Sequence, residues 1–212
     1  NTLVQLTGNE NNLQLAGDFN TSNQSFDMVL NIQQLQMKSV QGFSAKAIQD
    51  AEGFLSGKLD IKGNAKAPQV LGKISFNNVG MTIAKTGSNF RKINDAILFQ
   101  NDGLKFNQFQ LKDTQGNALT INGKIATTNY QDFGFDLKVT ADDFKVVDAE
   151  EDQEKMMYGK LAIDANLNIK GKLDLPKVDG NLSVTESTDF TFVLPQSSPS
   201  LKDREGCLLY TS

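Results

Sequence analysis

Residues 161–171 read Leu-Ala-Ile-Asp-Ala-Asn-Leu-Asn-Ile-Lys-Gly, and this stretch decides the fold class. Apolar residues stand at every second position from Leu161 to Ile169, and small or polar residues stand between them. A period of two is typical of a β-strand that has one face against an apolar region and the other in water. The final glycine, Gly171, lets the chain turn into a further strand.

The same alternation recurs along the chain, for example from Phe26 to Ile32 and from Phe133 to Val139. Turn-forming segments separate these stretches, and Asn101-Asp102-Gly103 is typical of a tight hairpin. Strands of a parallel sheet would read as continuous apolar runs, but no such run exceeds four residues. The sequence therefore predicts an all-β fold, an antiparallel meander of roughly eleven or twelve strands.

Two segments interrupt the alternation. Residues 44–52 begin with Ser44, a good helix N-cap, and are followed by Gly53, a typical helix stop. Residues 148–158 begin with Asp148 and carry several acidic residues in what would be a first helical turn. Each segment is predicted to be a single short helix or an ordered loop.

An internal repeat is the strongest signal beyond composition. Residues 59–75 recur 108 residues later as residues 167–183, with eight identities in seventeen aligned positions, where unrelated sequences give about one. The shared residues that define the repeat are Leu59, Ile61, Gly63, Pro68 and Gly72 in the first copy and Leu167, Ile169, Gly171, Pro176 and Gly180 in the second.

Units that bury a face only against their neighbours build elongated structures. We therefore expect residues 1–206 to form one segment of a β-repeat domain, with units near 13–50, 53–115, 117–158 and 159–195. The alternative is a pair of similar hairpins in an ordinary β-sandwich. Residues 207–212, Cys-Leu-Leu-Tyr-Thr-Ser, look like a translated sequencing adapter, so we expect a non-native tail there; a natural short strand is the alternative.

Composition excludes several classes of chemistry. The 212 residues contain no His and no Trp, and Cys207 is the one cysteine, which argues against a Ser-His-Asp triad, a His/Cys zinc site and a disulfide framework. A net charge of −4 argues against nucleic acid as a partner. We expect no enzymatic activity, no catalytic residues, no metal and no cofactor.

The apolar side of the strands is the remaining candidate site. A closed protein core is its default interpretation, and the functional interpretation is an open groove that solvates acyl chains. Alternation does not separate the two, because both need one apolar face per strand. The candidate lining residues are Leu119, Ile121, Ile125, Phe133, Phe135, Leu137, Val139, Leu161, Ile163, Leu167, Ile169, Phe190, Phe192 and Leu194.

These motifs resemble a known family. Leu-x-Ile-x-Gly followed by Pro-x-Val-x-Gly looks like the repeating unit of the TamB (DUF490) and AsmA-like proteins of double-membraned bacteria. Most of residues 53–206 is similar to TamB-domain proteins of the Bacteroidetes. The more specific motifs are Tyr158-Gly159-Lys160-Leu161, residues 188–196 (Thr-Asp-Phe-Thr-Phe-Val-Leu-Pro-Gln) and residues 203–206 (Asp-Arg-Glu-Gly).

The resemblance implies a long β-sheet curled into a taco-shaped groove. It implies a periplasmic protein of the cell envelope, anchored in the inner membrane by a segment outside this sequence. The implied partners are phospholipid acyl chains and an outer-membrane barrel of the Omp85 class. The implied role is carrying phospholipid towards the outer membrane and supporting outer-membrane biogenesis. The alternatives are a structural, adhesin-like β-repeat protein with a closed core, and a scaffold for outer-membrane protein assembly or secretion.

Overall fold

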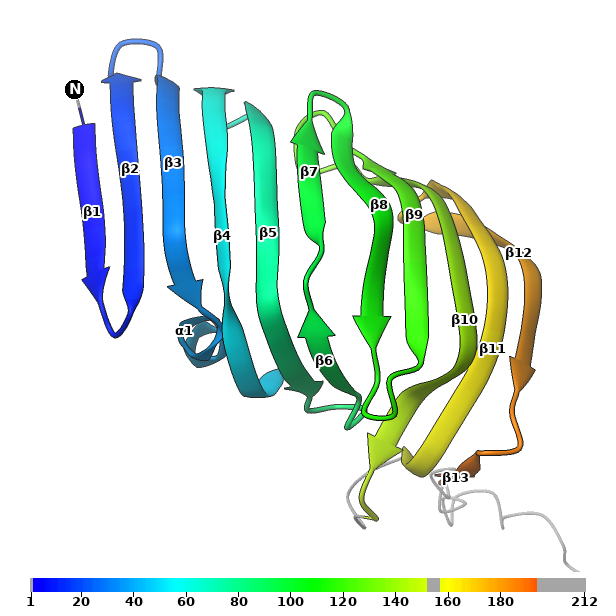
Figure 1. Cartoon of the computed structure of the whole chain (residues 1–212). Helices are drawn as coiled ribbons and strands as arrows, with labels where there is room; N and C mark the ends of the chain where they lie inside the picture. The colour runs from blue at the N-terminus through cyan, green and yellow to red at the C-terminus, as the bar shows by residue number, and fades with distance from the viewer. Residues whose placement is uncertain (1, 152–156, 194–212) are drawn as a thin grey trace, which may run out of the picture.

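A computed structural model describes residues 2–151 and 157–193 of the chain (Figure 1). Thirteen strands and one helix follow one another in these residues. Their bounds are β1 Thr2–Gly8, β2 Asn11–Asn20, β3 Ser25–Gln36, α1 Met37–Phe43, β4 Ile48–Asn64, β5 Ala67–Ile83, β6 Asn89–Ile93, β7 Ala96–Gln100, β8 Gly103–Lys112, β9 Ala118–Ala126, β10 Gly134–Ala149, β11 Met157–Lys172, β12 Leu175–Val184 and β13 Asp189–Phe192.

All thirteen strands belong to one sheet in which neighbouring strands pair antiparallel, in the order β1-β2-β3-β4-β5-β6-β8-β9-β10-β11-β12. The two strands off this path, β7 and β13, each lie end to end with another strand beside a common neighbour. β6 and β7 both pair with β5, and β12 and β13 both pair with β11. Because two positions in the sheet each hold two successive strands, the number of strands exceeds the expected eleven or twelve. The predicted all-β antiparallel meander is confirmed.

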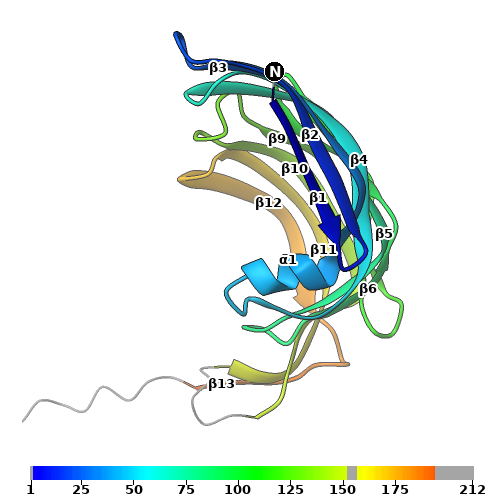
Figure 2. The same cartoon turned by 90° about the vertical axis from the view of Figure 1, so that its left-hand side faces the viewer.

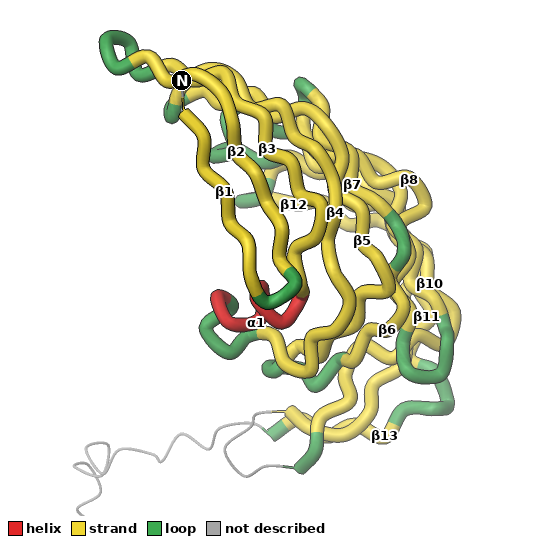
Figure 3. Tube along the Cα trace, turned by 60° about the vertical axis from the view of Figure 1, so that its left-hand side comes forward, coloured by secondary structure: helices red, strands yellow, loops and turns green. Residues whose placement is uncertain are grey.

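The sheet is bent along its strands, so that each strand arcs around a hollow side (Figure 2). We call this concave side the trough; its long direction runs across the strands, from β1 to β12. The connections between strands lie along its two rims (Figure 3). Helix α1 lies on the concave side, near one rim (Figure 2).

Residues 44–52, predicted to be a short helix or an ordered loop, are a helix nowhere and a loop only at 44–47: α1 ends directly before them, and residues 48–52 belong to β4. Ser44 closes α1 instead of opening a helix, since its N–H and its hydroxyl both donate to the carbonyl oxygen of Gln41 at 3.0 and 2.7 Å. Ala45 and Lys46 then adopt positive φ angles of 49° and 69°, which no helix contains. From Ile48 onward the chain pairs with β5, so tertiary contacts override the local helix propensity.

The second interrupting segment is also not helical at the ends that the structure describes. Asp148 and Ala149 complete β10, and Met157 and Tyr158 begin β11. Asp148 and Ala149 pair with Lys160 and Gly159 of β11, whereas Met157 and Tyr158 pair with β13. Residues 152–156 lie outside the described residues, as do residues 194–212 with the expected adapter tail.

The internal repeat corresponds to two hairpins. Its first copy covers the end of β4 and the start of β5, and its second copy covers the same parts of β11 and β12. The register is the same in both, with Gly63 opposite Pro68 and Gly171 opposite Pro176. The proposed limits of the four larger units stay a prediction.

Candidate functional site: an apolar trough

The strand registers gather the alternating apolar residues on one face of the sheet. Residues directly opposite each other on paired strands point to the same side. Leu137, for example, stands between Gly123 of β9 and Ile169 of β11. The same face can be followed through directly paired residues from β1 to β12 without interruption. The residues on this face of the described strands include no charged side chain.

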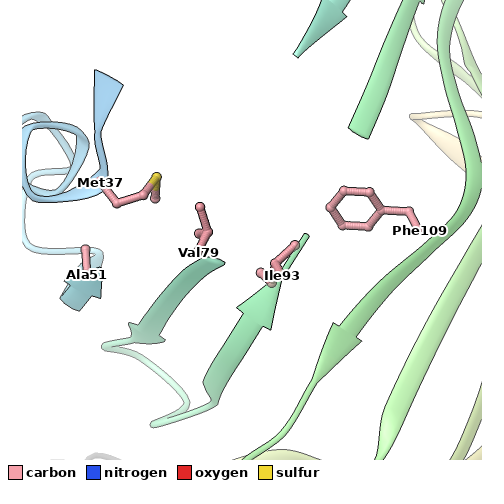
Figure 4. Close-up of a cluster of buried hydrophobic side chains, with 5 residues drawn as sticks. All are labelled: Met37, Ala51, Val79, Ile93 and Phe109. Carbon is pink, nitrogen blue, oxygen red and sulfur yellow. The ribbon is translucent and has the colours of Figure 1, made fainter. Parts of the chain in front are cut away.

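This apolar face is the concave one, because α1 packs on it. Met37 of α1 is 3% exposed and belongs to one cluster with Ala51, Val79, Ile93 and Phe109, which come from four different strands. Figure 4 shows these side chains directed into a shared space. Phe76 and Phe106 meet Phe109 edge to face, with ring centroids 5.2 and 5.9 Å apart.

Polar side chains fix α1 in this position. The amide of Asn11 donates to Ser39 Oγ at 2.9 Å, while its oxygen accepts from the N–H of Gln36 at 2.8 Å. On the other side, Gln41 Oε1 accepts from the N–H of Ala51 at 2.9 Å. The helix is therefore held by β2 and β4 as well as by the contacts of Met37.

A series of β-bulges crosses the sheet close to the α1 cluster. Non-glycine residues with positive φ mark several of them: Asp50, Asn78, Lys92, Gln108 and Asp143. Bulges of this kind bend a strand and increase its twist. They therefore help to bend the strands around the trough.

Side chains from the neighbouring segment of the sheet accept hydrogen bonds from the backbone N–H groups of the bulges. The N–H of Asn78 donates to Asn94 Oδ1 at 2.8 Å, and the N–H of Gln108 donates to Asn122 Oδ1 at 2.7 Å. The bulge in β10 is held in the same way, because the N–H of Asp143 donates to Asp164 Oδ1 at 2.8 Å. Each bulge leaves one backbone N–H group without its usual carbonyl acceptor on the paired strand, and the oxygen of an Asn or Asp side chain replaces that acceptor.

These bulges divide the trough into two halves. The helix-side half, on the α1 side of the bulges, is packed: Val79, Ile93 and Phe144 are the largest fully buried side chains among the described residues. Phe144 also stacks on Phe90, with ring centroids 6.1 Å apart. Here the apolar face is a closed core.

The turn-side half lies between the bulges and the rim that carries the β2–β3, β4–β5, β9–β10 and β11–β12 connections. Its lining is mostly half-buried and becomes more exposed towards the ends of the sheet. Val4 and Phe19 are 54% and 48% exposed at the β1 end, and Val178 and Leu182 are 60% exposed at the β12 end. None of the described elements packs over this half as α1 does over the other.

The structure places most of the candidate lining residues on the trough face. Phe135 opposes Ile125 and Gly171, Val139 opposes Ile121 and Leu167. Leu119 lies opposite Ala141 on the same face. Of these candidates, Leu119, Ile121, Ile125, Phe135, Leu137, Val139, Leu161, Ile163, Leu167 and Ile169 therefore share the trough face.

Two further candidates, Phe190 and Phe192 of β13, lie opposite Gly159 and Met157, so they share the trough face at the helix-side end of β11. The remaining two candidates do not belong to the described strands. Phe133 precedes β10 and lines a hollow of about 730 Å³ at the turn-side rim. Leu194 lies outside the described residues.

The sequence-based list also left out the first half of the lining. The missing residues of the turn-side half include Val4, Leu15, Phe19, Met28, Leu30, Leu59, Ile61, Ile74, Phe99 and Leu104. The same alternation that identified the other lining residues also identifies these, and the pairing of β2 to β8 shows that they share one face.

Charged groups gather on the convex face and on the rims. Lys62 pairs with Asp27 across β3 and β4 at 2.9 Å, and the hydrogen bond to Asp27 raises the pKa of Lys62. At the turn-side rim, the hydrogen bond from Lys124 lowers the pKa of Asp102. Hydrogen bonds from Ser187 and Thr185 lower the pKa of Asp143 in the β10 bulge. The trough therefore has a neutral lining between charged outer surfaces.

No group of three or more acidic or cysteine side chains that could hold a metal ion occurs among residues 2–151 and 157–193. In the same residues, no helix has the length and apolar character needed to cross a membrane. The arrangement of the described side chains suits the non-specific shelter of apolar groups.

Comparison with known proteins bears on the half of the chain from β8 onward. Residues 107–206, a little under half of the chain, match the family model for the TamB C-terminal domain. No curated protein and no solved structure matches the chain. The matched segment includes β9 to β13, and its strands continue the sheet that residues 2–106 begin. Residues 107–206 are therefore similar to the C-terminal domain of the TamB proteins, a non-enzymatic family that acts in the biogenesis of the bacterial cell envelope.

Proposed function

We propose that this chain is a section of a periplasmic TamB/AsmA-like protein and that its trough carries the acyl chains of phospholipids between the inner and outer membranes. An inner-membrane anchor and an outer-membrane barrel of the Omp85 class would act through parts beyond the described residues. The observation that supports this most directly is the continuous uncharged face that the registers form from β1 to β12.

An acyl chain needs no specific contact to be held in the trough. Each methylene group that leaves water contributes about 0.8 kcal/mol, so a lining several side chains wide can hold an acyl chain. The turn-side half is the part suited to this, because its apolar side chains are half-buried and unoccupied by α1. The charged convex face keeps the sheet in water while lipid lies inside.

The test is to measure phospholipid bound to the purified chain by extraction and mass spectrometry. In the variant Phe135→Arg a charge enters the turn-side half, and we expect bound phospholipid to fall at least fivefold. Leu71→Arg is the matched control, since Leu71 lies opposite Asp60 on the convex face and is 37% exposed. This control should keep its phospholipid.

A photocrosslinking residue makes the test independent of any folding defect. Benzoylphenylalanine at position 135 should capture phospholipid, and the same residue at position 71 should not. If the folded wild-type chain from a bacterial envelope carries no phospholipid, or if position 71 captures as much as position 135, the proposal is wrong. The first outcome would favour a structural β-repeat protein.

A further inference from the structure

A line of lysine side chains crosses the convex face of the sheet. Lys58 of β4 stands directly opposite Lys73 of β5, and both point away from the trough, because their neighbours Leu59 and Ile74 face it. The same line continues through directly paired residues of β7, β8, β9, β10 and β11 to β12 (Figure 1). Six of its eight residues form what we call the lysine row: Lys58, Lys73, Lys105, Lys124, Lys170 and Lys177.

The arrangement within this line opposes the usual rule for charges on a sheet. Three pairs of lysines are direct cross-strand neighbours: Lys58 with Lys73, Lys105 with Lys124, and Lys170 with Lys177. Like charges at such positions destabilise a sheet, whereas opposite charges stabilise it. Asp136 is the one acidic residue of the line, and Leu98 is the one apolar residue. Natural proteins break local rules of this kind mainly where a surface has a function.

The positive charge is confined to this line. Among the strands from β4 to β12, the neighbouring row on the turn side carries Asp60 and Lys172 as its charged residues, and the neighbouring row on the helix side carries Lys138 and Asp179. Each neighbouring row is therefore neutral, whereas the line has six lysines and one aspartate. Strands lie about 4.8 Å apart, so the line from β4 to β12 is about 34 Å long.

Several ammonium groups of the lysine row are available to a ligand. Lys73, Lys105 and Lys177 are exposed and form no ion pair with the residues that the structure describes. Lys124 pairs with Asp102 at 2.6 Å. The other two lysines approach a carboxylate only at 3.9 and 3.8 Å. The positive charge of the line is thus mostly uncompensated.

We propose that the lysine row binds a linear polyphosphate chain, which lies across the strands on the convex face. Exposed lysines bind a polyanion chiefly by releasing its condensed counterions, and closely spaced phosphates condense many of them. Lysine suits such a ligand because its ammonium group is a point charge that does not need the planar, bidentate geometry of arginine. A chain that follows the line can meet all six lysines at once.

The shape of the positive surface favours a linear ligand over other anions. A lipid bilayer would cover the neutral neighbouring rows as well as the line, and a single phosphate would meet only the lysines nearest to it. Single-stranded nucleic acid usually stacks its bases on aromatic side chains, but the paired residues of the line and its two neighbouring rows include no aromatic residue. A polyphosphate chain has no bases to accommodate.

The test is to titrate labelled long-chain inorganic polyphosphate with the lipid-depleted chain and to follow fluorescence anisotropy at several salt concentrations. The wild-type chain should bind long-chain polyphosphate more tightly per phosphate than tripolyphosphate, which spans only part of the line. In the double variant Lys73→Gln/Lys105→Gln the affinity should fall by about tenfold or more. The slope of log affinity against log salt should also become shallower by about 1.4, since each lost phosphate contact accounts for about 0.7.

The matched control is Lys66→Gln/Lys160→Gln, which removes the same charge from two exposed lysines off the line. Both lie at least about 20 Å along their strands from the lysine row, well beyond the screening length at physiological salt, so the affinity should change less than about twofold. Circular dichroism checks that both double variants are folded. Equal weakening by the two would overturn the proposal, because net charge alone would then explain the binding.

Other polyanions provide the remaining outcomes. Binding of polyglutamate, oligothymidylate or phosphatidylglycerol vesicles as tightly as long-chain polyphosphate would make the lysine row a site for an acidic polypeptide, a nucleic acid or a bilayer, and the proposal would be wrong. It would equally be wrong if the folded wild-type chain bound no polyphosphate. The lysine row lies on the opposite face from the trough, so these outcomes are separate from the phospholipid measurement.

Discussion

The two halves of the trough contain the same kinds of residue but differ in their surroundings. In the helix-side half, Met37 of α1 packs on the sheet, and Val79 and Ile93 have 0% and 1% of their surface exposed. In the turn-side half the same alternation of apolar residues remains half-buried. An apolar strand face therefore becomes a core or an open lining according to what lies on it. The seven residues of α1 make that difference here.

The largest expected effect separates two phenylalanines of the trough. Phe109→Ala removes a ring that is 5% exposed and contacts two other rings, so unfolding should become easier by about 3–5 kcal/mol. Phe135→Ala removes a ring from the half-buried turn-side lining and should cost less than half as much. Chemical denaturation followed by circular dichroism measures both. Equal losses would mean that the two halves are packed alike.

The next effect concerns α1 itself. Met37→Ala should lower the free energy of unfolding by about 2–3 kcal/mol, since the side chain fills the cluster between Ala51 and Val79. It should also increase the binding of a hydrophobic dye, because the helix-side half opens. Phe43→Ala is the control on the same helix: Phe43 is 92% exposed, so its loss should change stability by less than about 0.5 kcal/mol. If both variants behave alike, α1 does not close the helix-side half.

The bulges between the two halves give a smaller effect. Asn122→Ala leaves the N–H of Gln108 without its 2.7 Å partner and should lower the free energy of unfolding by about 1 kcal/mol. Asn168→Ala replaces an exposed asparagine on β11 that faces Lys138 across the sheet, and it should have little effect. A loss of similar size in both variants would show that the side chain of Asn122 does not hold the bulge.

The sheet could be predicted from the sequence because alternation is a local signal. Period two, with turns such as Asn101-Asp102, specifies both the strands and the hairpin between Gln100 and Gly103. The face shared by distant strands also follows, since antiparallel pairing of consecutive hairpins preserves it. Twelve of the fourteen candidate lining residues lie on the trough face for this reason.

The position of α1 and the bulges could not be predicted from the same signal. Ser44 is a residue type that favours the N-cap of a helix. It ends a helix here because Ile48 and the residues after it pair with β5. A bulge at Asn78 or Gln108 depends on an oxygen supplied by Asn94 or Asn122 from a different strand. Such contacts are tertiary, so a single sequence does not reveal which asparagine will provide the oxygen. The division into two halves therefore appears only in three dimensions.

The smallest effect we predict is a pH dependence at the β12 end, where the open lining meets the edge. Hydrogen bonds from the hydroxyls of Ser187 and Thr185, the latter at 2.5 Å, lower the pKa of Asp143 and fasten the β12–β13 connection to the β10 bulge. A carboxyl group with a lowered folded pKa stabilises the fold above its unfolded pKa of about 4 and loses that contribution as the pH falls through the folded pKa. The wild-type chain should therefore lose stability below about pH 4 more steeply than Asp143→Asn.

Denaturation midpoints measured from pH 2 to pH 6 provide the comparison. Asp179→Asn is the control, since Asp179 is an exposed carboxylate on β12 that lies opposite Asn168. This control should keep the wild-type slope. Because Asp143 is only partly buried, solvent and salt screen its interactions, and the difference in slope should be the smallest of the effects predicted above. Identical slopes for the wild type and Asp143→Asn would show that the two hydroxyl contacts do not hold the open end of the trough.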